Sequence, residues 1–321
     1  MDFVGLRWVV RAALIAFAFV LGGTVRAAPT DGPSRSVVAV LYPETSPPYR
    51  AVFADILNGI EQGIPASAVR SYPLVESVEP GALRRWLDQQ APAVVITLGR
   101  VPTEAYEATG RKTPQVIGAL EVSPQTRPLA TGIGLAIDPA LLFATLQLLT
   151  PEKRRVWVVY NPGHDRGLVD WAKTAAESLH LTLLPLEAPD LHTSAQQFLH
   201  VLRTADPETD ALWLVADTGV VDPEAILPVI IEQSWDRRLW VFSGSLLHVK
   251  HGVLFALYPD SVRLGQRLAA LALRVINDPR ARPGIELLRT VKRALNLRVA
   301  FHLNLSVTGE IERQFDLVLP P

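Results

Sequence analysis

In the stretch KRRVWVVYNPGHDRG, residues 153–167, an apolar run passes directly into Asn-Pro-Gly and then into polar residues. A short apolar run that ends at a Pro-Gly turn is typical of a buried strand. The residues between Gly167 and Leu179 then show apolar positions spaced as on one face of a helix. The stretch therefore predicts a strand, a turn and a helix, which is the repeating unit of an α/β fold.

The same pattern occurs in the first half of the chain. Residues 36–43 form an apolar run that ends at Tyr42, and Tyr160 follows Tyr42 by 118 positions (160 − 42). The apolar runs 93–98 and 211–216 are offset by the same number (211 − 93). Strands that alternate with long helical patterns indicate parallel βαβ units. We therefore expect an α/β fold with two similar lobes, each a parallel sheet flanked by helices, hinged around a ligand cleft.

The repeat also predicts the domain boundaries. We expect a first lobe over residues 36–130, a second lobe over residues 138–242, and a segment over residues 243–321 that crosses between the lobes and packs back across them. The segments 131–137 and 246–253 join the repeated halves and carry glycines, so we expect them to form the hinge.

The first 27 residues have the pattern of a secretory signal peptide. Arg7 and Arg11 precede a short apolar run over residues 12–20, and Val25-Arg26-Ala27 suits cleavage after Ala27. The alternative is an uncleaved membrane anchor, but a spanning helix needs about 20 apolar residues and this run is shorter. The sequence therefore predicts a periplasmic protein. It has no Cys, which excludes disulfides and a cysteine-linked lipid.

The charge balance of the chain argues against a polyanionic partner. Lys and Arg together number 31, and Asp and Glu together number 32. A nucleic-acid-binding domain usually carries an excess of basic residues. We therefore expect no nucleic-acid partner.

Candidate ligand-binding residues follow from the predicted strand ends, because ligands of open parallel sheets lie beyond the carboxyl ends of the strands. This rule selects Thr45, Ser46, Gly99, Arg100, Glu121, Asn161, His164, Asp217, Thr218, Ser243 and Tyr258. Backbone N–H groups at the start of the following helices would attract a carboxylate, and Arg100 would add a bidentate contact. Asp217 would accept a hydrogen bond from an ammonium group, so the set fits an amino-acid-like ligand.

Each of these assignments has a structural alternative. Asn-Pro-Gly after a strand is often only a turn, and Thr45, Ser46 and Asp217 can serve as caps of helices or turns. Arg100 can equally be solvated. Tyrosines near the predicted cleft would stack on a flat ligand or serve only in packing; these are Tyr42, Tyr49, Tyr160 and Tyr258.

The chain resembles the substrate-binding proteins of ABC transporters with the type I periplasmic binding fold, in particular the subfamily with tryptophan- and aromatic-amino-acid-binding members. The resemblance rests on residues 155–163, similar to that group's V-x-x-x-Y-N-P-G segment, on residues 251–260 with the following Leu264-Gly265, and on residues 295–300, similar to its closing L-N-L-x-x-A. It implies capture of a small molecule, possibly an amino acid or related solute, and an ABC permease as membrane partner of a monomeric protein.

The sequence departs from that group at two places in the predicted site. Residues 164–167 read His-Asp-Arg-Gly where the group has acidic residues and Asn-Ser, so a hydroxyl expected to bind a ligand carboxylate is missing. Gly219 and Val220 after Thr218 also differ from the group. A periplasmic ligand sensor that signals to a membrane kinase or cyclase is the alternative function.

Motifs of common enzymes are absent from the sequence. Ser243-Gly244-Ser245 lacks the frame of a Gly-x-Ser-x-Gly nucleophile elbow, and no His-Glu-x-x-His occurs. His248 and His251 are three positions apart and would be the alternative metal site. A hydrolase would need a nucleophile–base pair, which the sequence pattern does not reveal. We therefore expect a binding protein without catalysis, without a cofactor and without a metal.

Overall fold

The computed structural model describes residues 36–47, 49–75, 80–122, 127–278, 280 and 283–320. The predicted signal peptide, residues 1–27, lies outside these described residues. Residues Ser36–Pro321 form one compact unit. No helix in the described ranges is both long and apolar enough to cross a membrane.

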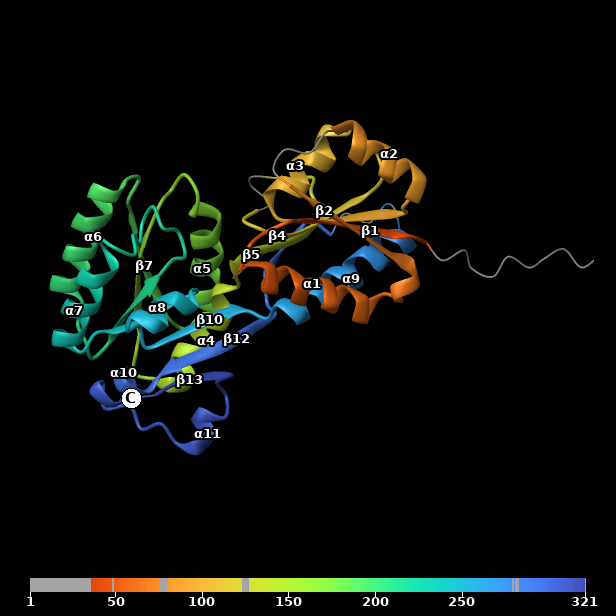
Figure 1. Ribbon diagram of the computed structural model, residues 1–321. Coiled ribbons are helices and arrows are strands. Elements are labelled where there is room, and N and C mark those ends of the chain that lie inside the picture. Colours follow the sequence, from red (N-terminus) through yellow and green to blue (C-terminus); the bar gives the residue numbers. More distant parts are fainter. Residues whose placement is uncertain are drawn as a thin grey trace, which may run out of the picture. The chain divides into compact units, whose positions relative to one another are not determined.

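The first sheet has six strands in the described chain, in the order β11-β5-β4-β3-β1-β2, and all pairs are parallel (Figure 1). Its strands are β1 (Val38–Pro43), β2 (Val69–Leu74), β3 (Val94–Leu98), β4 (Gln115–Leu120), β5 (Gly132–Ile137) and β11 (Ile285–Leu288). The helices around it are α1 (Tyr49–Gly63), the short 3-10 helix η1 (Ala66–Ala68), α2 (Pro80–Gln90), α3 (Arg100–Ala108) and α9 (Ser261–Asn277).

Both faces of the first sheet are covered, because successive side chains of a strand point to opposite faces. Val38 and Val40 of β1 share a core cluster with Ile56 of α1. Leu41 belongs instead to the cluster that contains Leu83 of α2. Burial on both faces explains why these strands read as continuous apolar runs rather than as an alternating pattern.

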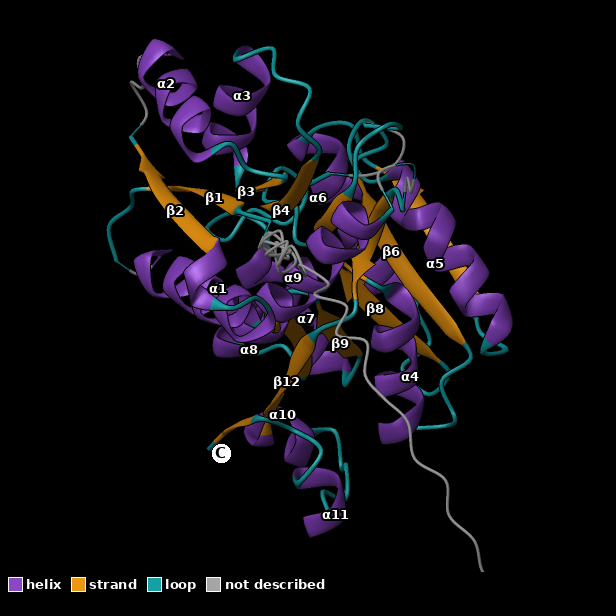
Figure 2. Ribbon diagram, turned by 90° about the vertical axis from the view of Figure 1, so that its right-hand side faces the viewer, coloured by secondary structure: helices purple, strands orange, loops and turns teal. Residues whose placement is uncertain are grey.

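The second sheet has seven strands in the described chain, in the order β13-β12-β10-β9-β8-β6-β7, and only β10 and β12 are antiparallel among its pairs (Figure 2). Its strands are β6 (Arg155–Tyr160), β7 (Thr182–Glu187), β8 (Asp210–Leu214), β9 (Trp240–Ser243), β10 (Phe255–Pro259), β12 (Val291–Asn296) and β13 (Leu317–Leu319). Its helices are α4 (Pro139–Leu149), α5 (Arg166–Ser178), α6 (Leu191–Thr204), α7 (Leu227–Arg237), α8 (Leu246–His251), α10 (Leu297–His302) and α11 (Gly309–Glu312).

Aromatic contacts identify the two faces of the second sheet. Trp213 of β8 and Phe242 of β9 meet Phe143 of α4 edge-on, with centroid distances of 5.7 and 6.3 Å. Trp157 of β6 faces His200 of α6 at 6.1 Å. The helices α4 and α6 therefore cover opposite faces. The predicted fold class, two mostly parallel sheets flanked by helices, is confirmed.

The chain passes from one sheet to the other at three places in its described part. These places are residues 137–139 after β5, residues 259–261 after β10 and residues 288–291 between β11 and β12. The crossings are joined to one another, because Asp138 N donates to Leu288 O and Asp260 N donates to Thr290 O, both at 3.0 Å. The prediction that residues 246–253 join the halves is wrong, since α8 connects β9 to β10 and these strands pair within the second sheet.

The C-terminal range 243–321 supplies elements to both sheets. Its helix α9 packs against α1 beside the first sheet (Figure 1). The two helices approach so closely that a Cβ on Gly265 would lie 2.1 Å from Ile56 O, and one on Gly59 would lie 2.0 Å from Val262 O. Glycine is therefore required on both helices at this contact.

Candidate functional site

A cavity of about 360 Å³ lies at the carboxyl ends of strands from both sheets. The first sheet contributes residues after β4 and at the end of β5, and the second contributes residues after β6, β8 and β9. The lining is Glu121, Val122, Leu135, Ala136, Ile137, Leu142, Gly163, His164, Asp165, Leu168, Trp171, Trp213, Val215, Ala216, Asp217 and Gly244. The volume lies within the range of small-molecule sites, roughly 300–1,000 Å³.

One wall of the cavity is apolar and aromatic. Leu142 of α4, Leu168 and Trp171 of α5, and Trp213 of β8 line it. Trp213 is only 2% exposed, and its ring is fixed by the edge-on contact with Phe143. Core packing thus holds the Trp213 ring in place at the border of the cavity.

The polar part of the cavity is acidic. Glu121, Asp165 and Asp217 line it together with His164, and the described lining contains no Lys or Arg. His164 Nδ1 lies 3.7 Å from Asp217 Oδ2. The described chain contains no group of three or more His, Asp or Glu side chains placed to hold a metal ion.

Among the residues that line the cavity, Asp165 has the most strongly shifted pKa. Burial raises the pKa of Asp165 to about 6, and repulsion from Asp217 and Glu121 adds to the rise. The residue precedes α5, but its side chain makes no capping hydrogen bond there. One oxygen of this carboxyl group, Oδ2, is therefore buried without a hydrogen-bond partner among the described residues.

Asp217 combines a structural and a free oxygen. Its Oδ1 accepts a hydrogen bond from Gly219 N at 2.8 Å and so closes the turn after β8. Its Oδ2 is buried without a hydrogen-bond partner in the described part of the chain. The sequence suggested that Asp217 either caps a turn or faces a ligand. These two roles are compatible, because the turn uses Oδ1 and a ligand would meet Oδ2.

Three residues selected from the sequence, Glu121, His164 and Asp217, lie together in the cavity. The remaining candidates lie outside its described lining: Thr45, Ser46, Gly99, Arg100, Asn161, Thr218, Ser243 and Tyr258. The strand-end rule therefore placed three of its candidates in the lining of this cavity and the others outside it.

The second-sheet candidates that lie outside the cavity lining are explained by their local surroundings. Asn161 Oδ1 accepts from Gly163 N at 2.9 Å, so this side chain closes the Asn-Pro-Gly turn. Tyr258 packs with Val249 and Ala256 on the side of β10 near β13. Thr218 is exposed.

The first-sheet candidates lie near the ends of β1 and β3. Gly99 has φ 83°, a left-handed conformation that glycine adopts without strain, and it begins α3. Arg100 is exposed at the first turn of that helix, and Ser46 is exposed in the loop after β1. Thr45 Oγ1 is buried with no hydrogen-bond partner among the described residues.

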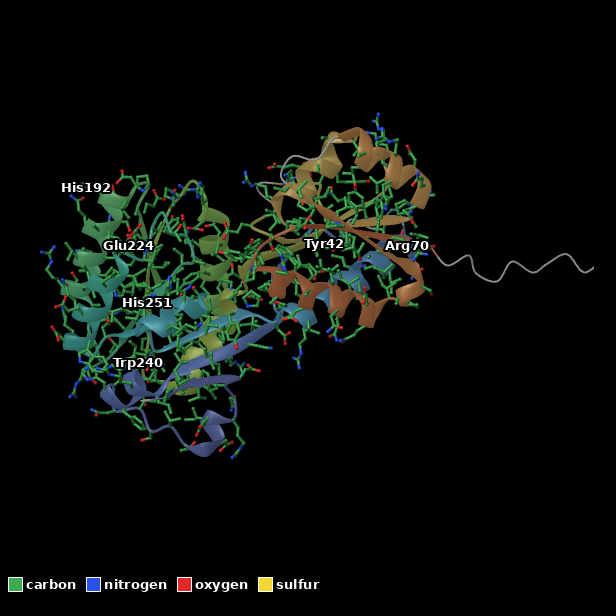
Figure 3. The ribbon with its side chains drawn as sticks, in the orientation of Figure 1. Tyr42, Arg70, His192, Glu224, Trp240 and His251 are labelled. Atoms are coloured by element: carbon green, nitrogen blue, oxygen red, sulfur yellow. The ribbon has the colours of Figure 1, made fainter. Side chains whose placement is uncertain are left out.

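The other tyrosines that the sequence suggested for stacking also lie outside the cavity lining. Tyr42 lies on β1 (Figure 3) and packs against the core. Tyr49 begins α1 and is 65% exposed. The Tyr160 hydroxyl lies 3.0 Å from Glu187 Oε1 and donates to it. The aromatic surface of the cavity comes instead from Trp171 and Trp213.

A serine–histidine pair that the sequence pattern did not reveal lies behind the cavity. Ser243 Oγ is 2.7 Å from His248 Nδ1, and it accepts from Ser245 N at 3.0 Å. Ser243 is fully buried and His248 is 5% exposed. Burial, with a contribution from His251, lowers the pKa of His248 to about 4. No substrate can reach this hydroxyl, so the pair fixes the turn between β9 and α8.

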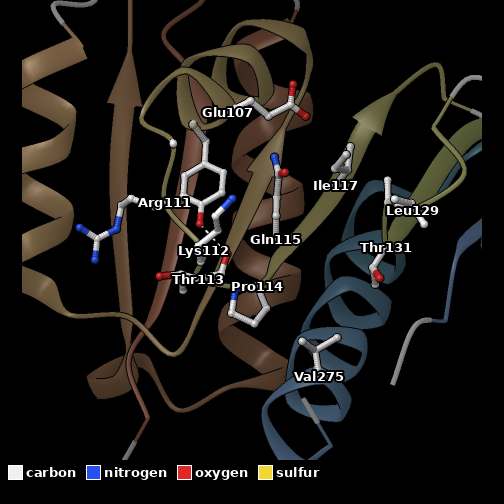
Figure 4. A pocket seen from close by; sticks show the side chains of 13 residues that line it. Glu107, Arg111, Lys112, Thr113, Pro114, Gln115, Ile117, Leu129, Thr131 and Val275 are labelled. Atoms are coloured by element: carbon white, nitrogen blue, oxygen red, sulfur yellow. Dashed lines mark hydrogen bonds between the residues drawn. The ribbon is translucent and has the colours of Figure 1, made fainter. Parts of the chain in front are cut away.

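A second hollow of about 370 Å³ lies around the loop between α3 and β4 (Figure 4). Two of its polar side chains have partners within the first sheet region: Tyr106 OH donates to Thr113 O, and Gln115 Nε2 donates to Thr97 Oγ1. Arg111 pairs with Asp88. It lies at the amino end of β4, away from the strand ends where the two sheets contribute side chains together.

No family model and no curated protein matches this sequence. Solved structures do match. A substrate binding protein with adhesive properties from Clostridium difficile, in a ligand-free, open structure, has a TM-score of 0.64 at 12% identity, over 89% of this chain and 100% of the other. The ABC domain in complex with L-Trp from Streptococcus pneumonia has a TM-score of 0.56 at 16% identity, over 88% and 99%.

A conserved domain protein from Vibrio cholerae has a TM-score of 0.55 at 15% identity, over 89% of this chain and 100% of the other. At such low identity these likenesses concern the fold and not the ligand. The chain has the two-sheet α/β fold of the type I periplasmic binding proteins.

Proposed function

We propose that this protein is an exported solute-binding protein that captures a small molecule in the cavity between its two sheets and delivers it to an ABC importer. The observation that carries the proposal is the cavity itself. It combines carboxyl-terminal strand ends of both sheets, a fixed aromatic wall and convergent polar groups, and these are the features of small-molecule sites.

Two further features support binding by closure around the ligand. The sheets are joined at three described crossings that are hydrogen-bonded to one another, and short crossings of this kind can act as a hinge. The solved structures with the same fold include a substrate binding protein in an open form and an ABC domain in complex with L-Trp.

We also propose that the site is not catalytic. The described lining contains no Ser, Thr, Cys or Lys, so it offers no hydroxyl, thiol or amine nucleophile for covalent catalysis. The buried Ser243–His248 pair faces away from solvent and is not part of the lining. The expected membrane partner is a permease, and the expected form of the protein is a monomer.

A thermal-shift screen of the exported protein tests the proposal. A ligand present at 100 times its Kd stabilises the folded state by about 2.7 kcal/mol. The screen should contain cationic, zwitterionic, anionic and neutral solutes of similar size. At least one class should raise the melting temperature, and small-angle scattering with that solute should show a smaller radius of gyration.

Transport is tested separately from binding. Deletion of this chain and deletion of the permease gene should abolish uptake of the bound solute equally. Normal uptake without this chain, together with loss of a transcriptional response to the solute, would assign the protein to sensing instead. Absence of binding by every class would remove the proposal altogether.

A further inference from the structure

We propose that the ligand of the cavity is an organic cation: a protonated amine on an apolar or aromatic body, without a carboxylate. This inference rests on the proposed function, because it names the substrate class of the same site. It differs from the amino-acid-like ligand that the strand-end residues predict.

The charges around the cavity are the first observation. Glu121 follows β4, Asp165 precedes α5 and Asp217 follows β8, so three separate elements each bring a carboxylate to one space. His164 is the single titratable base in the described lining. Arg166, the next base along the chain, pairs with Glu187 at 3.1 Å. A ligand carboxylate would meet three like charges and no fixed cation.

The start of α5 is the second observation. The N-terminus of a helix of this length normally attracts an anion through its free N–H groups. Here the protein's own carboxylate, Asp165, stands at that position. A ligand carboxylate at the start of α5 would therefore lie close to a like charge.

The unpaired oxygens are the third observation. Asp165 Oδ2 and Asp217 Oδ2 are both shielded from solvent without a hydrogen-bond partner among the described residues. Asp217 contributes to the raised pKa of Asp165, so the two carboxyl groups lie close enough to interact. Buried polar atoms are nearly always hydrogen-bonded, and an ammonium group has three donors and no acceptor. An ammonium group that enters the cavity would supply a hydrogen-bond donor to these oxygens.

The apolar and aromatic side chains of the lining indicate the chemistry of the uncharged part of the ligand. Trp171 and the buried Trp213 line the cavity together with the apolar side chains of Leu142 and Leu168. A hydrated inorganic cation would gain nothing from these side chains. An amine with an aromatic or branched apolar body buries that body against them while its ammonium group meets the carboxylates.

Calorimetry with two matched series tests the substrate class. One series is tryptamine, tryptophan and 3-indolepropionate; the other is phenethylamine, phenylalanine and 3-phenylpropionate. Within each series the body is nearly constant while the charge changes from cation to zwitterion to anion. We expect at least one amine to bind, at least tenfold more tightly than its zwitterion, with no detectable binding of the acids.

Variants assign the binding to the carboxylates. Asp165→Asn and Asp217→Asn should each weaken binding of the amine at least tenfold. Asp170→Asn, on the exposed side of α5 beside Lys173, removes the same charge outside the lining and should change the Kd less than twofold. Thermal melts of all three ligand-free variants confirm that each is folded.

The pH dependence gives an independent readout. Asp165 loses its charge as the pH falls through about 6, with Asp217 and Glu121 as its acidic neighbours and His164 beside them. Amine binding should therefore weaken several-fold between pH 7.5 and pH 5, and Asp165→Asn should reduce that dependence.

Three results would overturn the inference. If a zwitterion or an acid binds as tightly as its amine, the substrate class is wrong while the solute-binding function stands. If neither series binds but neutral or anionic solutes of the wider screen do, the same conclusion follows. If no solute of any charge class binds, both the inference and the proposed function fail.

Discussion

Replacing Asp165 by Asn should stabilise the ligand-free protein at neutral pH. The pKa of Asp165 is raised from 3.8 to about 6 in the folded state. A carboxyl group with a raised folded-state pKa stabilises the fold fully below its unfolded value, and that contribution is lost as the pH rises through the folded value. The loss therefore falls between about pH 4 and pH 6, and Asn removes it.

The magnitude follows from the shift. One pKa unit corresponds to about 1.4 kcal/mol, so a shift of about two units sets an upper limit of about 3 kcal/mol. Partial exposure of the side chain and the favourable position of a carboxylate at a helix start reduce this to about 1–2 kcal/mol. For a protein of this size that is about 2–6 °C in Tm.

Thermal denaturation of both proteins between pH 4 and pH 8, without ligand, is the assay. The gain should be near zero at pH 4 and complete above about pH 7. Asp170→Asn, which removes an exposed charge from the same helix, should show no such profile. A difference that is independent of pH, or a loss of stability at pH 7.5, would refute the reasoning that Asp165 is held in an unfavourable environment.

Three further changes test the fold and the site. Gly265→Ala should cost about 1–3 kcal/mol in chemical denaturation because its Cβ meets Ile56 O at 2.1 Å, whereas Gly309→Ala, with only a side-chain nitrogen at 3.6 Å, should cost far less. Trp213→Ala should lower the free energy of unfolding by about 3–5 kcal/mol, measured by urea titration, and an unchanged midpoint would contradict its place in the core. Asp217→Ala should cost about 1 kcal/mol of stability through the lost Gly219 contact, and should raise the Kd for the bound solute tenfold or more by calorimetry; loss of stability with unchanged affinity would leave Asp217 as a turn cap alone.

The order of strands and helices follows from local patterns, which is why it was predictable. Continuous apolar runs such as residues 93–98 and 211–216 mark strands buried on both faces. Turn residues after each run mark the sheet edge at which ligands bind. Those two rules were enough to predict two parallel sheets, and to place Glu121, His164 and Asp217 at the edges that form the cavity.

The places where the chain crosses between the two sheets were not predictable in the same way. Residues 246–253 look like a connection between two halves because they contain a glycine and follow the repeated region. Only strand pairing shows that β9 and β10 belong to the same sheet and that the chain leaves it later, at residues 259–261. Strand pairing depends on contacts between segments far apart in the sequence, so a local sequence pattern does not predict it.

The amino-acid sequence by itself determined the α/β class, the two-sheet repeat and the sheet edge at which the candidate residues lie, because strand and helix periodicity, turn chemistry and burial are properties of neighbouring residues. The tertiary structure decided which candidates meet. It turned Asn161 into a turn cap, brought Asp165 beside Asp217, and added Trp213 as a wall. The acidic character of the cavity is therefore decided by tertiary structure, because its three carboxylates come from three separate elements that meet only after the chain has folded.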